Sequence, residues 1–473
     1  MTGLAVVIGG GANELVAAHY LARSGCRVLV LEPRAAPGDA SAEIGWIPPR
    51  VVRDLDLERH GLAIDRPDPW ATVALPDGGR LELWNDMARS VEAMRRLSPR
   101  DAQRWPSFCE RMARLARLFA TLYTAPPPDP LSLAFALRAR RLGRQGMEDL
   151  LRLTPMSVAD LLDDWFESDA LKGVLGAAGI MHYAKGPRAA GTAFRLLHHH
   201  VGSPAGVFRP PRSNIGRVLA ALGGIEIRRG ASPARIEVRE NRVTGVVLAS
   251  GEQIAASLVV SGADPRRTLL DWVDPGWLDP QFVRALKHLR CRGVAARVTL
   301  ALARPPDFAT LVVAPSLAYL ERASDDAKYG RVSRAPYLEA RHGDRRVEVH
   351  VQYAPYALAD GEWDAVRRDA LGDSVLGLLP PELGASVVER TVLSPRDLEA
   401  QEDLPEGQAY HAELSLDQAL WMRPVPGWAR YRMPIEGLYL CGLATHPGGG
   451  VAGAAGLNCA REALRALRSR RSR

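Results

Sequence analysis

A run of three glycines near the N-terminus has the spacing of a phosphate-binding turn. It follows a short apolar stretch, residues 4–8, that is typical of a buried parallel strand, and it precedes apolar residues at helical spacing. Gly9 would permit the tight turn, and Gly11 would let the backbone approach a pyrophosphate. Because the first N–H groups and the positive dipole end of a helix attract anions, we expect cofactor contacts from Gly9, Gly11, Ala12 and Asn13.

The residues that follow complete a strand, helix and strand unit. A second apolar run, residues 27–31, is predicted as the next parallel strand, and Glu32 closes it. A carboxylate at this strand end is placed to accept hydrogen bonds from a ribose 2′-OH, and we expect it at the protein surface, with Arg34 as a further cofactor contact. The N-terminal unit is therefore predicted to bind a dinucleotide.

A second glycine-rich run lies near the C-terminus, at residues 442–456. A strand is predicted at 437–441 and a helix after the run, so small residues again meet a helix N-terminus. They leave room for a flat, bulky group, and the helix dipole favours the negative charge that a flavin gains near N1 and O2 on reduction. We expect flavin contacts from Gly442, Gly449, Gly450 and Val451. Together the two runs favour FAD over NAD, because the flavin must reach a site far from the adenine.

Histidines supply two further candidates. His446 lies inside the C-terminal run and is our candidate catalytic residue; the alternative is a hydrogen bond that holds the turn. The run from His198 to His200 could suggest a metal, but consecutive side chains diverge and no carboxylate lies at ligand spacing. We therefore predict no metal site.

Composition favours a large α/β protein over a nucleic-acid-binding or disulfide-rich one. The 473 residues exceed what one core usually supports, so two domains are expected. The net charge of +7 comes almost entirely from arginine, without zinc-finger or RNA-binding motifs, and we predict no nucleic-acid partner. No run is apolar enough to span a membrane and no basic targeting segment precedes residue 4, so we expect a cytoplasmic protein.

The segment 131–144 combines apolar residues with several arginines. It could lie in a membrane interface, or it could form a helix packed on the core, which is the simpler interpretation. Peripheral membrane contact therefore stays an open expectation.

The rest of the chain alternates between helical and strand patterns. Helices are expected over 101–124 and 157–177, the latter with caps at Ser157 and Ser168; strands are expected at 235–238, 243–248, 257–260, 293–302 and 346–353. The predicted fold is α/β, with a discontinuous Rossmann-type FAD-binding domain from residues 1–75, 205–275 and 425–473. A second domain of mixed sheet and helices, from residues 76–204 and 276–424, would bind the substrate.

The two glycine-rich ends and three internal segments carry a family resemblance. The internal segments are 157–171, 186–194 and 258–265. They resemble the bacterial phytoene-desaturase-like branch of the flavin-dependent amine-oxidase superfamily, close to the pyridine nucleotide-disulfide oxidoreductase-domain proteins. The resemblance extends from about residue 4 to residue 467. It implies an FAD-dependent oxidoreductase that dehydrogenates, saturates or isomerises a mostly apolar substrate.

Four positions near the expected cofactor depart from the family pattern. Glu14 replaces the third glycine, Asp39 replaces the second glycine of a pair, Ser213 stands where glycine is expected, and Pro233 has no N–H to offer an adenine. A carboxylate aimed at a phosphate would be repelled, so we expect Glu14 to turn toward an arginine or solvent.

Two hypotheses about function follow. The first is an FAD-dependent dehydrogenase or desaturase that transfers a hydride from a C–H bond of a largely apolar small molecule to flavin N5. The second is a degenerate homologue that keeps the fold but serves as a non-catalytic partner subunit of an active relative. A homo-oligomer, or a heteromer with such a homologue, is compatible with either hypothesis.

Overall fold

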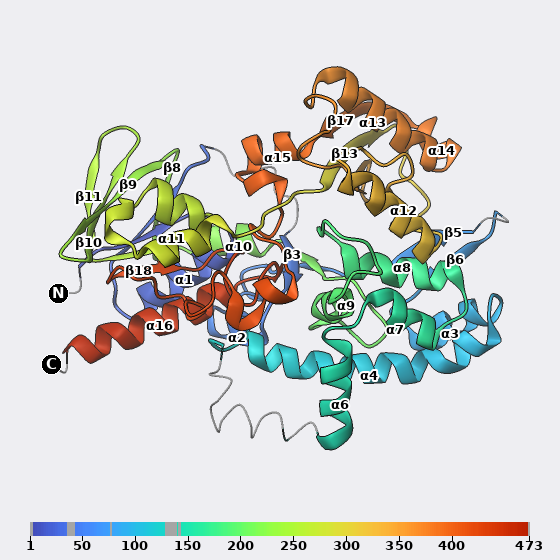
Figure 1. Cartoon of the computed structure of the whole chain (residues 1–473), viewed down its shortest axis with the longest axis horizontal. Coiled ribbons are helices and arrows are strands. Elements are labelled where there is room, and N and C mark those ends of the chain that lie inside the picture. Colours follow the sequence, from blue (N-terminus) through green and yellow to red (C-terminus); the bar gives the residue numbers. More distant parts are fainter. Residues whose placement is uncertain (1–2, 36–42, 76–77, 128–139, 141–142, 472–473) are drawn as a thin grey trace.

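A five-stranded parallel sheet forms the centre of one lobe of the computed structural model, which describes residues 3–35, 43–75, 78–127, 140 and 143–471 (Figure 1). Its strand order is β18 (Leu438–Leu440), β12 (Leu258–Ser261), β1 (Ala5–Ile8), β2 (Val28–Glu32) and β8 (Glu226–Arg229). All neighbouring strands run parallel. This confirms the predicted α/β class with a Rossmann-type sheet.

Both faces of this sheet are covered, which explains why its strands are apolar without alternation. Val7 belongs to the core beneath α1 (Ala12–Arg23), α10 (Ile215–Ala221) and α16 (Ala454–Arg471). Val6 and Ile8 face the opposite core. That core is closed by α11 (Pro280–Lys287) and by an antiparallel sheet of β9 (Pro233–Arg239), β10 (Arg242–Leu248) and β11 (Gln253–Ala255).

A seven-stranded sheet organises the second lobe (Figure 1). Its order is β17 (Val387–Leu393), β13 (Ala295–Leu302), β16 (Arg346–Gln352), β15 (Tyr337–Gly343), β14 (Thr310–Val313), β5 (Ala71–Ala74) and β6 (Arg80–Leu83). Leu338 and Ala340 pack with α13 (Ala365–Leu378) and α14 (Pro381–Gly384) on one face. Tyr337, on the other face, packs with a layer of helices that includes α3 (Met87–Arg95), α4 (Pro99–Tyr123), α8 (Asp169–Ile180), α9 (Thr192–His200) and α12 (Leu317–Lys328).

Most expected helices and strands are confirmed. The segment 157–177 forms two helices, α7 (Val158–Trp165) and α8. As predicted, the hydroxyls of Ser157 and Ser168 accept hydrogen bonds from backbone N–H groups in the first turns of these helices. α4, β9, β10, β12, β13 and β16 lie where the sequence placed them.

The structure moves one expected domain boundary and leaves one expected segment largely undescribed. β5 pairs with β14 and β6, so the second lobe begins before the boundary that the sequence placed at residue 75. A short apolar strand does not reveal which sheet it joins, which explains the shift. The segment 131–144 lies largely outside the described residues, and no described helix is long and apolar enough to cross a bilayer.

Candidate functional site

The N-terminal glycine turn has the geometry of an anion site. Gly9 adopts a φ of 106°, which favours glycine, and its N–H donates to the Leu31 carbonyl at 2.8 Å. Gly11 is the N-cap of α1 and, as a glycine, makes no side-chain capping bond. α1 begins with Ala12 and Asn13. The N–H groups of its first turn are directed toward the glycine turn, where a phosphate could accept hydrogen bonds from them.

Glu32 lies directly against this turn. A Cβ on Gly10 would collide with its carboxylate, so the close approach requires glycine there. The carboxylate accepts the Arg34 backbone N–H at 2.9 Å and guanidinium N–H groups at 3.0 and 3.2 Å. Glu32 is only 3% exposed, so our expectation of a surface position is wrong; β8 covers the end of β2 and leaves the carboxylate facing the glycine turn.

Glu14 does not turn toward solvent, and that part of the expectation is also wrong. It is 7% exposed, and its Oε1 lies 4.0 Å from the Cys441 Sγ. A Cβ on Gly262 would collide with the Glu14 carboxylate. The side chain thus fills the space that glycines leave between β1, β12 and α1, and a carboxylate lies directly beside the phosphate-binding turn.

The C-terminal run pairs with a strand of a small separate sheet. β19 (Gly450–Val451) lies parallel to β3 (Glu43–Trp46), which is followed by β7 (Arg212–Ser213) and β4 (Ile64–Asp65). Gly450 pairs with Gly45, and no Cβ would fit on Gly45 against this backbone. Gly450 has a φ of 84°, so its position in the turn also favours glycine.

Buried side chains from distant parts of the chain support Gly449. The imidazole Nε2 of His198 donates to its carbonyl at 2.7 Å, and the Tyr123 hydroxyl donates to Nδ1 of the same ring at 2.7 Å. The ring of Tyr410 packs so closely on Gly449 that a Cβ there would overlap it. Burial lowers the pKa of His198 to about 3, so the ring is neutral and holds one tautomer.

His446 is buried at the end of α4. Its Nε2 donates to the Leu122 carbonyl at 3.1 Å, while its own carbonyl accepts the Tyr431 hydroxyl at 2.8 Å. Burial lowers its pKa to about 4. These contacts hold the turn in place; the assignment of His446 as the catalytic residue stays a prediction.

The structure brings the two predicted cofactor-binding ends together. The Gly453 N–H donates to Asn13 Oδ1 at 3.0 Å, and a Cβ on Gly456 would collide with the Asn13 carbonyl oxygen. The Gly442 backbone packs just as closely on Gly262. α1 and α16 therefore cross at a point that only small residues permit, and both helix N-termini face the same region.

The other departures lie in different surroundings. Ser213 is buried in β7, and Pro233 begins β9, where it pairs with Leu248. Asp39 lies outside the described residues.

The three consecutive histidines bind carbonyls rather than a metal. His199 Nδ1 donates to the Ala178 carbonyl at 2.6 Å, and His200 Nδ1 donates to the Val207 carbonyl at 2.7 Å. Within the described ranges, no group of three or more His, Cys, Asp or Glu residues could hold a metal ion.

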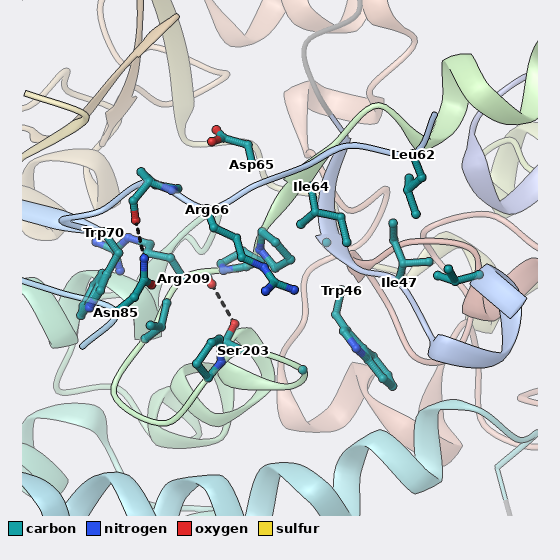
Figure 2. Close-up of a pocket in the computed structure, with 18 of the residues that line it drawn as sticks. Trp46, Ile47, Leu62, Ile64, Asp65, Arg66, Trp70, Asn85, Ser203 and Arg209 are labelled. Atoms are coloured by element: carbon teal, nitrogen blue, oxygen red, sulfur yellow. Dashed lines mark hydrogen bonds between the residues drawn. The ribbon is translucent and has the colours of Figure 1, made fainter. Parts of the chain in front are cut away.

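A cavity of about 420 Å³ opens between the small sheet and the second lobe (Figure 2). Figure 2 shows an apolar part formed by Trp46, Ile47, Leu62 and Ile64. The opposite part contains Trp70 with the polar side chains Asn85, Ser203 and Arg209. The volume lies within the range of about 300–1,000 Å³ that is usual for small-molecule sites.

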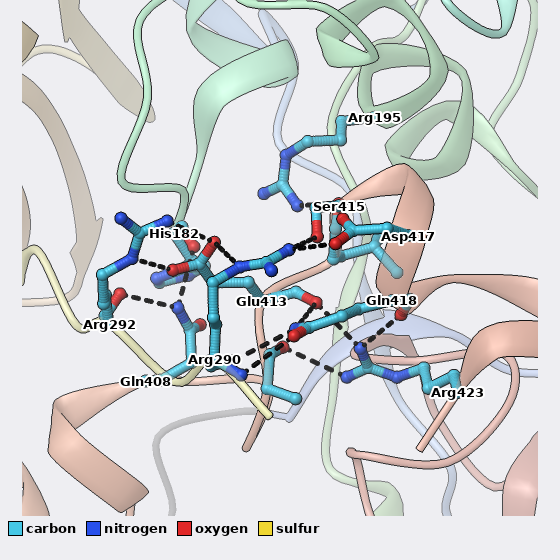
Figure 3. A network of polar contacts seen from close by, with 12 residues as sticks. His182, Arg195, Arg290, Arg292, Gln408, Glu413, Ser415, Asp417, Gln418 and Arg423 are labelled. Carbon is cyan, nitrogen blue, oxygen red and sulfur yellow. Dashed lines mark hydrogen bonds and ion pairs between the residues drawn. The ribbon is translucent and has the colours of Figure 1, made fainter. Parts of the chain in front are cut away.

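A buried polar network next to the C-terminal run was not foreseen (Figure 3). Arg423 is fully buried and donates to five backbone carbonyls, those of Tyr410, Ala412, Glu413, Gln418 and Leu443. Burial lowers its pKa to about 9. Arg292 and Arg290 bind the buried Glu413 carboxylate. No local pattern in the sequence marks these residues, because their partners are backbone carbonyls of irregular segments.

These residues fit a bound FAD. The start of α1 at Gly11 suits a pyrophosphate, Glu32 suits a ribose, and the glycines at 449 and 450, which carry no side chains, suit the edge of a flat ring system. The Glu14 carboxylate is the one feature of the phosphate end that opposes an anion.

Comparison with known proteins agrees with this geometry. Residues 7–54 match the NAD(P)-binding Rossmann-like domain, and residues 49–464 match the flavin containing amine oxidoreductase family. The chain is 32% identical to pyridine nucleotide-disulfide oxidoreductase domain-containing protein 2 of Rattus norvegicus. The alignment covers 98% of this chain and 94% of the relative. It is 25% identical to one of the subunits of the limonene dehydrogenase of Castellaniella defragrans, covering 96% and 93%.

The fold is also that of a solved oxidase. A putrescine oxidase variant with redesigned cofactor binding superposes with a TM-score of 0.60 at 15% identity, and the match covers 99% of both chains. With a family match that spans most of the sequence and a site that suits the cofactor, the chain belongs to the flavin containing amine oxidoreductases and is an FAD-dependent oxidoreductase.

Proposed function

We propose that this chain is a catalytic dehydrogenase whose largely apolar substrate binds in the 420 Å³ cavity. The observation that carries the proposal is the position of the cavity. Gly45 and Trp46 line it, and the same two residues pair with Gly450 and Val451. When bound, the flavin would accept a hydride equivalent from a substrate C–H bond.

The side chains at this end of the cavity would orient the substrate and exclude water. Trp46 and Ile47 come from β3 and the segment that follows it, and Leu62 and Ile64 come from β4 and the segment before it. Apolar walls suit a hydrocarbon segment, which needs positioning more than polar recognition. The similarity to a protein named for the dehydrogenation of limonene, an apolar hydrocarbon, supports the same substrate class.

Anaerobic mixing of the FAD-loaded protein with apolar candidates tests the proposal. We expect loss of the visible flavin absorbance and a product that lacks two hydrogen atoms, detected by mass spectrometry. Trp46→Ala should slow flavin reduction and raise the substrate concentration that is needed, while the flavin content stays unchanged. Equal reduction rates in Trp46→Ala and the unsubstituted protein would contradict the assignment of the cavity.

A second candidate function is a non-catalytic partner within a heteromer. Two observations favour it: the Glu14 carboxylate beside the phosphate-binding turn, and a relative that is named as one subunit of a dehydrogenase. It predicts flavin that no substrate reduces when this chain is alone but that becomes reducible after an active homologue is added. Reduction by substrate in the isolated chain would exclude this alternative.

A further inference from the structure

The cavity carries more positive charge than its surroundings neutralise. At its polar end, Arg209 Nε lies 2.6 Å from Glu339 Oε2, and Arg341 lies 2.7 Å from Glu339 Oε1. Both guanidiniums line the cavity and are at least nine-tenths buried. One carboxylate therefore faces two arginines.

The Glu339 carboxylate is ionised and paired with both arginines. Burial alone would raise its pKa, but Arg209 and Arg341, with a hydrogen bond from the Tyr337 hydroxyl, hold the pKa of Glu339 well below its usual range. The neighbouring Arg212 is compensated separately, by Glu348 at 2.8 Å. One buried guanidinium charge at the cavity wall thus has no matching carboxylate in the described cluster.

Arg66 adds a second guanidinium, which is exposed to solvent. It follows β4, lines the cavity, and makes no hydrogen bond or ion pair with any residue that the structure describes. Figure 2 shows its side chain among the lining residues, between the apolar part and Arg209; the neighbouring Asp65 also lines the cavity. Glu58 also lines the cavity, on the side of the helix α2 (Pro49–Asp54).

We infer that the cavity takes an amphipathic anion: a hydrocarbon chain that ends in a carboxylate or a phosphate. Its oxyanion lies against Arg66 and the Arg209–Arg341 pair, and its apolar chain lies along Trp46 and Ile47. Guanidinium groups suit both headgroups, because they present several N–H donors to planar or tetrahedral oxyanions. The inference rests on the proposed use of this cavity for the substrate, and it places the reacting C–H bond in the chain, away from the headgroup.

Ligand binding to the FAD-loaded protein tests the inference without a turnover assay. The probes are dodecanoate, dodecyl phosphate and dodecanol, followed by isothermal titration calorimetry below their micelle concentrations. We expect at least one of the two anions to bind about tenfold more tightly than the alcohol, the size of effect that one charge-assisted contact gives. The tighter of the two anions identifies the headgroup.

Two substitutions locate the effect. Arg66→Gln should abolish most of the preference for the anion and leave dodecanol binding unchanged. Arg59→Gln is the matched control, because Arg59 is an exposed arginine of the same segment that pairs with Asp56 outside the cavity. It should leave all three affinities unchanged.

The outcomes separate this inference from the proposed function. Equal binding of anion and alcohol, unaffected by Arg66→Gln, would overturn the inference and leave an apolar substrate site. Failure of all three probes to bind would overturn both. An anion preference that survives Arg66→Gln but not Arg341→Gln would still support the oxyanion site and assign it to the deeper pair.

Discussion

The two ends of the cofactor site are built in different ways. The phosphate end, from Gly9 to Glu32, comes from one continuous stretch of chain and depends on backbone geometry within a strand, helix and strand unit. The flavin end around Gly449 is held by buried side chains from distant segments, among them His198, Tyr410 and Arg423. We therefore expect substitutions at the phosphate end to change cofactor affinity, and substitutions at the flavin end to unfold the protein.

The largest effect should come from Arg423→Met. The change leaves five buried carbonyl oxygens without their donor, and loss of one partner from such a buried network costs about 5 kcal/mol. Urea unfolding of the protein without FAD measures it. Arg430→Met is the control, because Arg430 pairs with Glu462 at the surface and should cost less than about 1 kcal/mol. Equal losses in both variants would remove the distinction between the two ends.

Acid should weaken the flavin end next. The pKa values of His198 and His446 are lowered from 6.5 to about 3 and about 4, so the unfolded chain binds protons that the folded one does not. Stability is therefore complete above about pH 6.5 and falls as the pH is lowered, by about 4 kcal/mol at pH 5 for the two rings together. Urea unfolding at pH 7 and pH 5 should show a loss of at least this size, because other buried histidines, such as His199 and His200, also have lowered pKa values.

His446→Gln separates one ring from the other. It should reduce the loss of stability at pH 5 by about 2 kcal/mol, the share of one ring, because a glutamine does not titrate. An unchanged dependence would mean that His446 is not held neutral in the folded state.

The glycine turn of the phosphate end is easier to recognise in the sequence than the side chains that support the flavin end, for a physical reason. Gly9, Gly11 and Glu32 are marked by their spacing along the chain, and spacing is visible in a sequence. Arg423 and Tyr410 act through partners far away in sequence, in irregular segments without periodicity. The histidine run makes His198 conspicuous in the sequence, but its partner Gly449 follows only from the fold.

At the phosphate end, Glu32→Ala should lower FAD affinity by about 2 kcal/mol, roughly thirtyfold, because it removes a carboxylate that accepts ribose hydroxyls. Fluorescence quenching of FAD measures the affinity, and urea unfolding without FAD checks the fold. Glu226→Ala, on the neighbouring strand β8, removes an exposed carboxylate and should leave FAD binding intact. An unchanged FAD affinity in Glu32→Ala would show that the Glu32 carboxylate binds only Arg34 and does not contact the ribose.

The smallest expected effect is at Glu14, where the two ends of the site meet. Glu14 lies in the first turn of α1, and its Oε1 is 4.0 Å from the Cys441 Sγ at the start of the C-terminal run. A negative charge beside the turn repels a pyrophosphate by about 1 kcal/mol at an effective dielectric between those of the protein surface and water. Glu14→Gln keeps the shape of the side chain and removes the charge, so FAD affinity should rise about fivefold with little change in stability.

Glu14→Gly separates charge from packing. It should give the same gain in FAD affinity as Glu14→Gln, but it also empties the space between Gly9, Gly11 and Gly262 and places a glycine in a helix, which should cost about 1–2 kcal/mol of stability. Titration of FAD into both variants, together with urea unfolding, measures the two quantities independently. If only Glu14→Gly binds FAD more tightly, bulk rather than charge limits the phosphate end. If Glu14→Gln binds FAD more weakly than the unsubstituted protein, the carboxylate holds the turn in shape, and the phosphate end then depends on a buried polar side chain in the same way as the flavin end.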